Sequence, residues 1–394
     1  MQKSIPFSPP DITDDEINAV VEVLRSGWIT SGPKVAKLEK EIAEFCEANY
    51  SVTLSSATAG MELILKVLDI GAGDEVITTP YTYAATANVI THRGIKPTFV
   101  DVAKDSFFID IEKLPEFINE KTKAIITVDI AGAPVDYDSV RAVLKSIGRE
   151  DIVLISDSAH SFGAVYKNRR VGGQCDFHVF SFHAVKNFTT AEGGAITFNN
   201  NHFAGKEDLY RELKVTSLHG QTKDALSKMK AGAWKYDIIT DGFKCNMTDI
   251  QAAIGLVQLD RYSDMLNKRK KLVEIYDRVL SDYSWAIIPF LKNNNTESCY
   301  HLYTLRIKGF VEEQRNKLIE LLAEKGIATN VHFMPLPMFS FYNNLGYKME
   351  DYPNAYNQYK NEISLPLYSI LKEEDAEYVA VEVAKFVSEI MNKK

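Results

Sequence analysis

A lysine in a polar loop is the residue of this sequence best suited to covalent chemistry. Lys186 follows the β-rich run 177–182 and precedes Gly193 and Gly194. A lysine amine attacks a carbonyl only as the free base, which partial desolvation or a nearby cation favours by lowering its pKa. A lysine in such a loop can equally be a solvated surface residue. Taken alone, Lys186 is therefore only a candidate nucleophile.

A second candidate is the carboxylate of Asp157, which ends the apolar run 153–157. A carboxylate at the end of a buried strand can hold a heteroaromatic nitrogen protonated through a charge-assisted hydrogen bond. Pyridoxal phosphate (PLP) needs such a partner, because its protonated ring is the electron sink of its chemistry. The alternative is that Asp157 caps the helix that follows.

Small hydroxyl residues precede a predicted helix and could form an anion site. Ser55, Ser56 and Thr58 stand with Gly60 at the start of that helix, where free backbone amides favour a phosphate. The same pattern is typical of ordinary helix capping. Tyr83, which follows another apolar run, could stack on a heteroaromatic ring or simply pack in the core.

Composition excludes several classes of protein. With a formal net charge of −8 over 394 residues, the chain lacks the basic excess of nucleic-acid-binding surfaces. Cys46, Cys175, Cys245 and Cys299 form no CxxC pair, which argues against disulfides or a zinc site and favours a reducing compartment. No apolar run approaches the roughly 18 residues of a membrane span, and residues 1–16 do not resemble a signal peptide. We expect a cytoplasmic protein without metal, nucleic acid or membrane.

Two nucleotide-binding motifs are missing from the sequence. There is no GxxxxGK[ST] segment, and Gly71-Ala72-Gly73 lacks the third glycine of a dinucleotide fingerprint and precedes a strand-like run. These observations argue against a P-loop kinase and a dehydrogenase.

The elements around the candidate residues alternate between β-rich and helical runs. Three helices are predicted first, at 13–24, 34–46 and 58–68. The predicted strands are 75–79, 98–102, 124–129, 153–157, 177–182 and 195–198, and the helices between them are 84–92, 111–119 and 136–147. This alternation favours an α/β fold with a mostly parallel sheet covered by helices. Ligands of such sheets bind outside the carboxyl ends of the strands, which is where Tyr83, Asp157 and the segment after residue 182 are expected.

The pattern changes near residue 248. We predict a long helix at 249–280, a strand at 302–307, a helix at 311–325, a β-like run at 327–333 and a final helix at 373–391. These elements indicate a smaller α/β domain joined through the long helix. We therefore predict a large domain over residues 1–255, which carries the candidate residues, and a small C-terminal domain over residues 256–394.

Seven segments together resemble the DegT/DnrJ/EryC1/StrS family of sugar aminotransferases, within the PLP fold-type I superfamily. They keep the family's order over nearly the whole chain: GWITSGP at 27–33, SSATAG at 55–60, PYTYAATAN at 80–88, SDSAHSFGA at 156–164, SFHAVKN at 181–187 with TTAEGG at 189–194, GFKCNMTDIQAAIGLVQL at 242–259, and VHFMP at 331–335. The resemblance implies the fold-type I architecture, with a mostly parallel seven-stranded sheet, and PLP as the cofactor.

The resemblance also implies roles for single residues. Lys186 corresponds to the lysine that forms a Schiff base with PLP, and Asp157 to the partner of the pyridine nitrogen. His160 corresponds to a residue near the ring hydroxyl. Tyr83 corresponds to the aromatic side chain that stacks on the ring, and Ala159 to the small residue packed on one ring face.

Further positions match the family's phosphate cradle. By the resemblance, Thr58, the amide of Ala59 and Ser181 bind the cofactor phosphate. The family usually completes this cradle with an Asn or Lys side chain from the partner subunit. Lys244 stands at that position, which implies a homodimer with shared active sites.

Substrate contacts are implied at four positions, and the sequence departs from the family at others. Trp28, His332, Tyr303 and Arg306 correspond to substrate-contacting residues, although Tyr303 and Arg306 could equally be structural. The family's usual EDAA reads SDSA at 156–159, which changes polarity beside the ring, and Cys245 replaces an aromatic residue.

The reaction implied by the resemblance is transfer of the amino group of L-glutamate to a nucleotide-linked keto sugar, in amino-sugar or polysaccharide biosynthesis. GWITSGP and VHFMP are most similar to the branch that aminates UDP-linked 4-keto sugars, as the UDP-4-amino-arabinose enzymes do. Amination of a dTDP-linked 3-keto sugar or of a cyclitol stays open. So do a PLP-dependent dehydratase, although some of these carry His in place of the lysine, and a non-catalytic regulatory protein with this fold.

Overall fold

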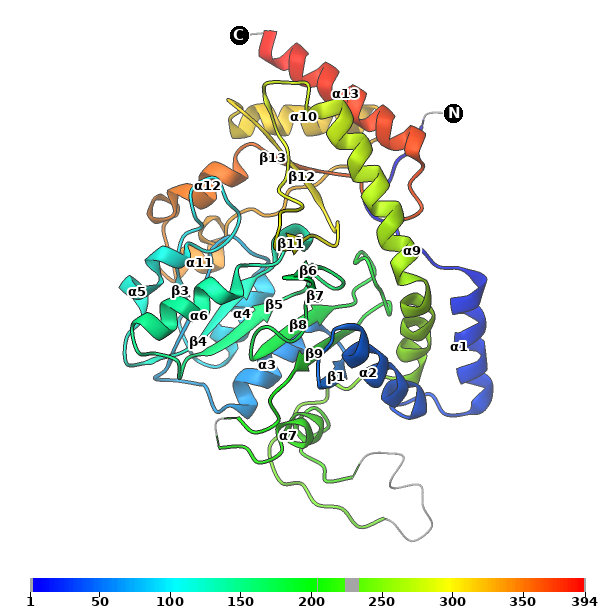
Figure 1. Ribbon diagram of the computed structural model, residues 1–394, viewed down its shortest axis with the longest axis vertical. Helices are drawn as coiled ribbons and strands as arrows, with labels where there is room; N and C mark the ends of the chain where they lie inside the picture. The colour runs from blue at the N-terminus through cyan, green and yellow to red at the C-terminus, as the bar shows by residue number, and fades with distance from the viewer. Residues whose placement is uncertain (1–2, 204, 224–233, 393–394) are drawn as a thin grey trace.

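The computed structural model describes residues 3–203, 205–223 and 234–392. In this part of the chain a seven-stranded sheet forms the centre of the larger body (Figure 1). Its strands, in spatial order, are β1 (Tyr50–Leu54), β9 (Gly194–Phe198), β8 (Phe177–Ser181), β5 (Val153–Asp157), β4 (Thr122–Val128), β2 (Glu75–Thr78) and β3 (Thr98–Phe99).

The sheet is mostly parallel, as the sequence predicts. Strand β9 pairs antiparallel with both β1 and β8, whereas β8, β5, β4, β2 and β3 pair in parallel. Six of the strands match predicted runs, and the fold-type I prediction is confirmed. Strand β1 was not predicted, because its five residues include polar Ser51 and Thr53 and begin shortly after the helix predicted at 34–46.

Helices cover both faces of this sheet. Successive strand residues point to opposite faces, so Leu154 packs in one core with α2 (Pro33–Phe45) and α6 (Tyr137–Ser146). Ile155 packs in the other core with α3 (Ala57–Val67), α4 (Ala84–His92) and α7 (Leu209–Thr216). Burial on both faces explains why the strand sequences are continuous apolar runs rather than alternating ones.

A smaller sheet forms a second body with its own core. It orders β10 (Ala286–Ile287), β12 (Tyr303–Ile307) and β13 (Glu362–Leu365), and α10 (Glu312–Glu324) and α13 (Glu373–Asn392) pack with it. Ile5 also belongs to this core, because the N-terminal segment pairs with Ile327.

The two bodies share one long helix, α9 (Asp249–Leu280), which begins with a capping box at Thr248. Along α9 the side chains pack in the first core as far as Leu266 and in the second core from Leu272. Helix α9 also packs against α1 (Asp14–Ser26), α2 and α13. The predicted division at residues 255 and 256 falls inside this helix and stays a prediction.

Several short elements complete the described chain. They are β6 (Val165–Tyr166), β7 (Arg169–Arg170) and β11 (Thr296–Glu297) in a small sheet, helices α5 (Leu114–Phe117), α11 (Ser340–Asn344) and α12 (Pro353–Tyr359), and 3₁₀ turns at Ile111–Lys113, Ile130–Gly132, Leu336–Met338 and Met349–Asp351. No helix among the described residues is long and apolar enough to cross a membrane.

Two predicted elements differ from the structure. The predicted helix 111–119 is a 3₁₀ turn followed by the four-residue α5, which ends at Phe117. The predicted β-like run 327–333 forms only isolated bridges, at Ile327 and Asn330. Its backbone leaves β13 after Asn330 and continues into a cavity, so it cannot extend the sheet.

Candidate functional site

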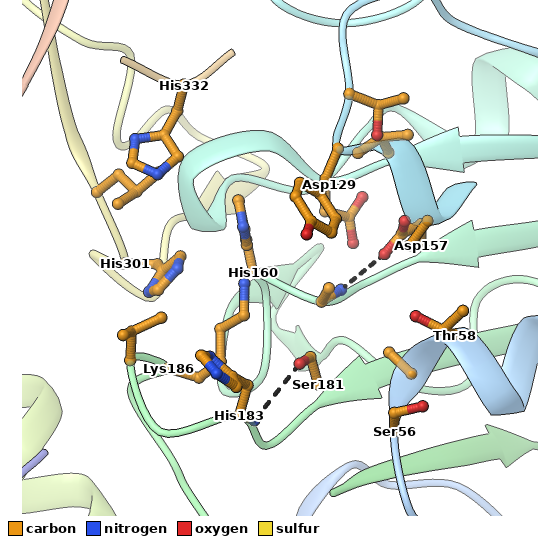
Figure 2. A pocket seen from close by; sticks show the side chains of 18 of the residues that line it. Ser56, Thr58, Asp129, Asp157, His160, Ser181, His183, Lys186, His301 and His332 are labelled. Atoms are coloured by element: carbon orange, nitrogen blue, oxygen red, sulfur yellow. Dashed lines mark hydrogen bonds between the residues drawn. The ribbon is translucent and has the colours of Figure 1, made fainter. Parts of the chain in front are cut away.

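A cavity of about 370 Å³ lies at the carboxyl ends of β4, β5 and β8. Its walls come from the loops after these strands, the start of α3, the loop after β2, and residues 7–8, 301–302 and 332–333. Figure 2 shows Lys186, His160 and His301 gathered on one side, with Asp157 and Thr58 opposite. Segments far apart in sequence therefore meet where ligands of parallel sheets bind.

Lys186 projects into this cavity from the loop that joins the antiparallel neighbours β8 and β9. The loop is closed by the N–H of Phe182, which donates to the carbonyl of Gly193 at 2.9 Å, and by a turn in which Lys186 N–H donates to His183 O at 2.9 Å. Burial lowers the pKa of Lys186 to about 8, with the Asp157 carboxylate acting in the opposite direction. Near neutral pH a useful fraction of this amine is therefore uncharged.

Asp157 is a buried carboxyl group with unused acceptor capacity. Its Oδ2 accepts from Thr86 Oγ1 at 2.7 Å and its Oδ1 from the Ala159 N–H at 3.2 Å. Burial raises its pKa, while these two donors and the charge of Lys186 act in the opposite direction. A carboxylate has about four lone-pair sites, so Asp157 can accept a further N–H donor from a molecule in the cavity.

Asp129, at the end of the neighbouring strand β4, is by contrast saturated. It accepts from the Val135 N–H at 3.1 Å, Tyr137 Oη at 2.7 Å, Ser158 Oγ at 3.0 Å and Ser161 Oγ at 2.6 Å. Four donors use its acceptor sites. Of the two buried carboxyl groups at this edge, Asp157 is therefore the one free to bind a ligand.

The hydrogen bonds around Asp129 also explain why this chain has Ser158 where the family usually has alanine. The Ser158 hydroxyl lies 3.0 Å from His178 Nδ1 as well as from Asp129 Oδ2. His178 Nε2 accepts from the N–H groups of Gln174 and Cys175, so its proton is on Nδ1. Ser158 thus bridges His178 to Asp129 behind the cavity wall.

The start of α3 forms a small polar cradle. Ser56 caps the helix, and its Oγ accepts from the Ala59 N–H at 3.1 Å. The amides of Ala57 and Thr58 have no partner within the helix because they belong to its first turn. The Thr58 and Ser181 side chains line the same part of the cavity, so the cradle offers an anion both hydroxyl and amide donors.

Gly194 allows strand β9 to approach this cradle. A Cβ atom at Gly194 would lie 2.5 Å from the Ala57 nitrogen and 2.7 Å from Phe180 O. Real Cβ atoms do not approach backbone atoms so closely, so any larger residue would push the helix start away from the sheet. The helix amides can therefore face the cavity only because residue 194 is glycine.

Three histidines, His160, His301 and His332, line the other side of the cavity. Burial and the neighbouring positive charges lower the pKa of all three, that of His332 to about 3. They are therefore neutral imidazoles near pH 7. Nowhere in the described ranges are three or more His, Cys, Asp or Glu side chains arranged to hold a metal ion.

Hydrogen bonds outside the cavity fix the tautomers of two of these rings. His160 Nδ1 accepts from the Ala131 N–H at 3.4 Å, so its proton is on Nε2. Asn187 donates its amide to Cys299 O and presents Oδ1 to His301 Nδ1 at 2.9 Å, so His301 carries its proton on Nδ1. Towards the cavity, His160 is a donor and His301 an acceptor.

The structure brings most of the predicted cofactor residues together. Tyr83 and Ala159 line the same cavity as Lys186 and Asp157, and the Tyr83 side chain is 65% exposed. Ala59 does not line the cavity, because its N–H belongs to the helix cap. The amides of the two residues before it are better placed.

Four further predicted residues lie outside this cavity. Trp28 donates from Nε1 to Ser31 O at 3.3 Å, and Lys244 is an exposed side chain bonded to its neighbour Asn246. Tyr303 is buried in the second core and donates to Asp277 at 2.7 Å. Arg306 lies over the ring of Phe107 at 5.6 Å. Tyr303 and Arg306 have structural partners within the chain.

Sequence reasoning missed three residues of the site: Thr86, Asp129 and His301. The rule that ligands bind at strand ends could have identified Asp129, because it ends a predicted strand. Thr86 lies in the first turn of α4, and its contact with Asp157 depends on how that helix packs. His301 precedes β12 in the smaller body and carries no local signal.

Residues 10–384 match the DegT/DnrJ/EryC1/StrS aminotransferase family. The chain therefore belongs to this family, which its fold and its lysine-containing cavity also indicate.

Solved structures and a curated relative are similar over almost the whole chain. The Streptococcus pneumoniae protein Spr1654, described as a sugar aminotransferase and solved in PMP and PLP forms, superposes with a TM-score of 0.94 at 47% identity in the PMP form, covering 98% of this chain and 100% of that one. Helicobacter pylori PseC, an aminotransferase involved in the biosynthesis of pseudoaminic acid, gives 0.89 at 31%, with the same coverage. The Bacillus subtilis spore coat polysaccharide biosynthesis protein SpsC is 38% identical over 387 residues, 97% of each chain.

These comparisons confirm the predicted class of enzyme. The chain is an aminotransferase of the PLP-dependent fold-type I class, and the prediction of PLP as its cofactor is confirmed at the level of the family.

Proposed function

We propose that this enzyme transfers the amino group of L-glutamate to a nucleotide-linked keto sugar, specifically a UDP-linked 4-keto sugar. The observation that carries the proposal is the convergence of Lys186, the free acceptor site of Asp157 and the Thr58–Ser181 cradle in one cavity. The sugar class is supported by relatives that are described as a sugar aminotransferase and as polysaccharide and pseudoaminic acid biosynthesis proteins.

The residues present fit PLP. The cradle at the start of α3 has free amides and hydroxyls for its phosphate, and Asp157 has the spare acceptor that a pyridinium nitrogen needs. Tyr83 and Ala159 would bound its ring, and His160, a donor at Nε2, would face its hydroxyl. When bound, this cofactor supplies the carbonyl that takes up the amino group and the electron sink that stabilises the carbanion.

Lys186 would act as both the covalent anchor and the proton carrier. Its Nζ would take the proton from the α-carbon of L-glutamate, working as a positioned general base. Its lowered pKa suits this role, because part of the amine is free base near neutral pH and can be protonated again in the reverse half-reaction. Asp157 keeps its charge to hold the ring nitrogen protonated throughout.

We also propose a homodimer in which Lys244 serves the partner's cavity. Lys244 is exposed and lies outside the cavity of its own chain, which suits a residue that completes a neighbouring site. Mixing Lys186→Ala and Lys244→Ala chains tests this idea. Random pairing should restore about a quarter of the sites, because half the dimers are mixed and each has one intact site. A mixture no more active than its components would contradict the shared site.

A cytoplasmic location is a further part of the proposal. All four cysteines, Cys46, Cys175, Cys245 and Cys299, are buried free thiols. Unpaired cysteines fit a reducing compartment. Fractionation of cells that express the tagged enzyme would test this directly.

The experiment that tests the function is an absorption spectrum of the PLP-loaded enzyme before and after L-glutamate. A visible band that gives way to a shorter-wavelength band would establish amino-group uptake, and UDP-linked 4-keto sugars should then restore the first band. Restoration only by dTDP-linked 3-keto sugars or cyclitol ketones would select those substrates instead. A dehydratase would consume sugar without glutamate, and a protein that acquires no visible band with PLP would be non-catalytic.

A further inference from the structure

His332 is held in the cavity wall by two residues of β13. The backbone N–H of His332 donates to Glu362 Oε2 at 2.9 Å, and its ring Nδ1 lies 2.9 Å from Ser364 Oγ. The Ser364 hydroxyl lies 2.6 Å from Glu362 Oε1. The three side chains therefore form a continuous chain of hydrogen bonds that runs from a carboxyl group outside the cavity to an imidazole within it.

Both β13 residues are fully buried, and backbone contacts hold them in place. Ser364 pairs with Asn330 through two backbone hydrogen bonds of 2.8 and 3.1 Å, which dock the His332 segment on β13. The carbonyl of His332 accepts from Tyr81 Oη at 2.8 Å. These backbone contacts hold Glu362, Ser364 and His332 in fixed relative positions. A change in the protonation of Glu362 is therefore transmitted through the hydrogen bonds to His332 rather than lost to solvent.

Few charged groups surround the Glu362 side chain. Arg315 of α10 donates to the Glu362 backbone carbonyl at 3.0 Å and lies 3.9 Å from Glu312. Arg306 of the neighbouring strand β12 directs its guanidinium towards Asp105 and Phe107. Tyr81 faces Glu362 from the loop after β2, as a neutral phenol. The carboxyl group itself receives no hydrogen bond from an arginine that the structure shows.

We propose that Glu362 is a positioning residue that decides, through Ser364, which nitrogen of His332 carries the proton. When Glu362 is protonated, its O–H donates to Ser364 Oγ, the Ser364 O–H donates to His332 Nδ1, and the proton of the ring is on Nε2. When Glu362 is ionised, Ser364 donates to the carboxylate and accepts from His332 Nδ1–H. His332 Nε2 is then a lone-pair acceptor, and the three hydrogen-bonded side chains together have lost one proton.

The protonated form dominates near neutral pH. Burial raises the pKa of Glu362 to about 8, against the opposing effects of Ser364, the His332 N–H and Arg315. Nε2 of His332, the ring nitrogen left for the cavity, is then a neutral donor. A neutral donor suits the carbonyl oxygen of a keto sugar, which can only accept. Above the pKa of Glu362 this nitrogen is itself an acceptor and cannot bind that oxygen. This consequence for the substrate rests on the function proposed above.

The tautomer can be read directly by ¹⁵N NMR of histidine-labelled PLP-loaded enzyme without substrate. The sequence contains eight histidines, and a His332→Gln variant assigns the resonances of interest. We expect Nε2 to be protonated at about pH 6.5 and Nδ1 at about pH 9.5, with a midpoint near the pKa of Glu362. A ring whose proton stays on the same nitrogen across this range would overturn the proposal.

Two variants separate transmission through the hydrogen bonds from Glu362 to His332, called here the relay, from general electrostatic effects of the Glu362 charge. In Glu362→Gln the amide donates to Ser364 at every pH, so His332 should keep the Nε2–H tautomer without a transition. In Ser364→Ala the carboxyl group remains but the transition at His332 should disappear. Glu312→Gln, near Arg315 but not linked to His332, is the matched control and should retain the transition. A transition that persists in Ser364→Ala would refute the relay.

Kinetics give the functional readout. In the wild-type enzyme, kcat/KM for the keto sugar should fall about tenfold between pH 7 and 9 through loss of the proton on Glu362. That part of the fall should be missing in Glu362→Gln, while the glutamate half-reaction keeps its wild-type profile. An identical fall in both proteins would contradict the role in sugar binding. Failure to aminate any nucleotide-linked keto sugar would instead refute the proposed function, and the NMR transition would be unaffected.

Discussion

The amine of Lys186 should be unusually reactive near neutral pH, and its reactivity should respond to Asp157. Burial in the cavity lowers its pKa to about 8, and the Asp157 carboxylate opposes this shift. At pH 7.5 roughly a quarter of such an amine is free base, against roughly one in a thousand for an ordinary lysine with a pKa near 10.4. The free-base fraction of Lys186 should therefore be about two hundred times that of exposed lysines at that pH, which should make it the faster to react although a less basic amine is a weaker nucleophile.

Competitive labelling measures this difference. The apoprotein is treated with trace acetic anhydride across a pH series, digested, and the acetylation of each lysine is quantified by mass spectrometry. The label on Lys186 should rise with a midpoint near pH 8. PLP should protect Lys186 and leave exposed lysines such as Lys40 labelled.

Replacing Asp157 with Asn supplies the perturbation. Removing the carboxylate takes away the interaction that raises the pKa of Lys186, so the midpoint should move to lower pH than in the wild-type protein. A wild-type midpoint near 10 would refute the reasoning that the cavity desolvates the amine. An upward shift in Asp157→Asn would refute the assigned direction of the Asp157 interaction.

Three further substitutions have defined outcomes. Lys186→Ala should remove nearly all turnover while circular dichroism stays unchanged, and full turnover would refute the role of Lys186. Ser158→Ala should lower the free energy of unfolding by about 1–3 kcal/mol in urea denaturation, because it leaves His178 Nδ1 unpaired; an unchanged midpoint would show that the bridge is unimportant. Gly194→Ala should weaken PLP binding in an equilibrium titration, since its Cβ would push the start of α3 away; unchanged affinity would show that the cradle adapts.

Much of the larger body could be predicted from the sequence because its signals are local. The strands around β5 and β8 are continuous apolar runs, and the rule for parallel sheets places Asp157 and the Lys186 loop at one edge. The missed strand β1 and the short helix α5 show the limit of such signals. Strand β1 includes polar Ser51 and Thr53, so it lacks the continuous apolar run of β5 and β8. Helix α5 has only four residues, too few for a helical period to emerge.

The rest of the site depends on contacts between distant segments. His301 and Thr86 are placed by the packing of β12 and α4, and Glu362 lies in a strand that was not predicted. Which of two buried carboxyl groups is free could not be read from the sequence either. That distinction depends on the four donors around Asp129, which come from two segments other than its own, residues 135–137 and 158–161.

The way in which the loop of Lys186 is held determines where the entropic cost of cofactor binding falls. The loop is closed between β8 and β9, and two further hydrogen bonds hold it. The Asn187 amide donates to Cys299 O at 2.7 Å, and Ser8 Oγ donates to Val185 O at 3.1 Å. The folding of the chain has already restricted this backbone, so little conformational freedom remains for a ligand to remove. Tyr83, 65% exposed, is in the opposite situation, and its side chain is where binding must impose order.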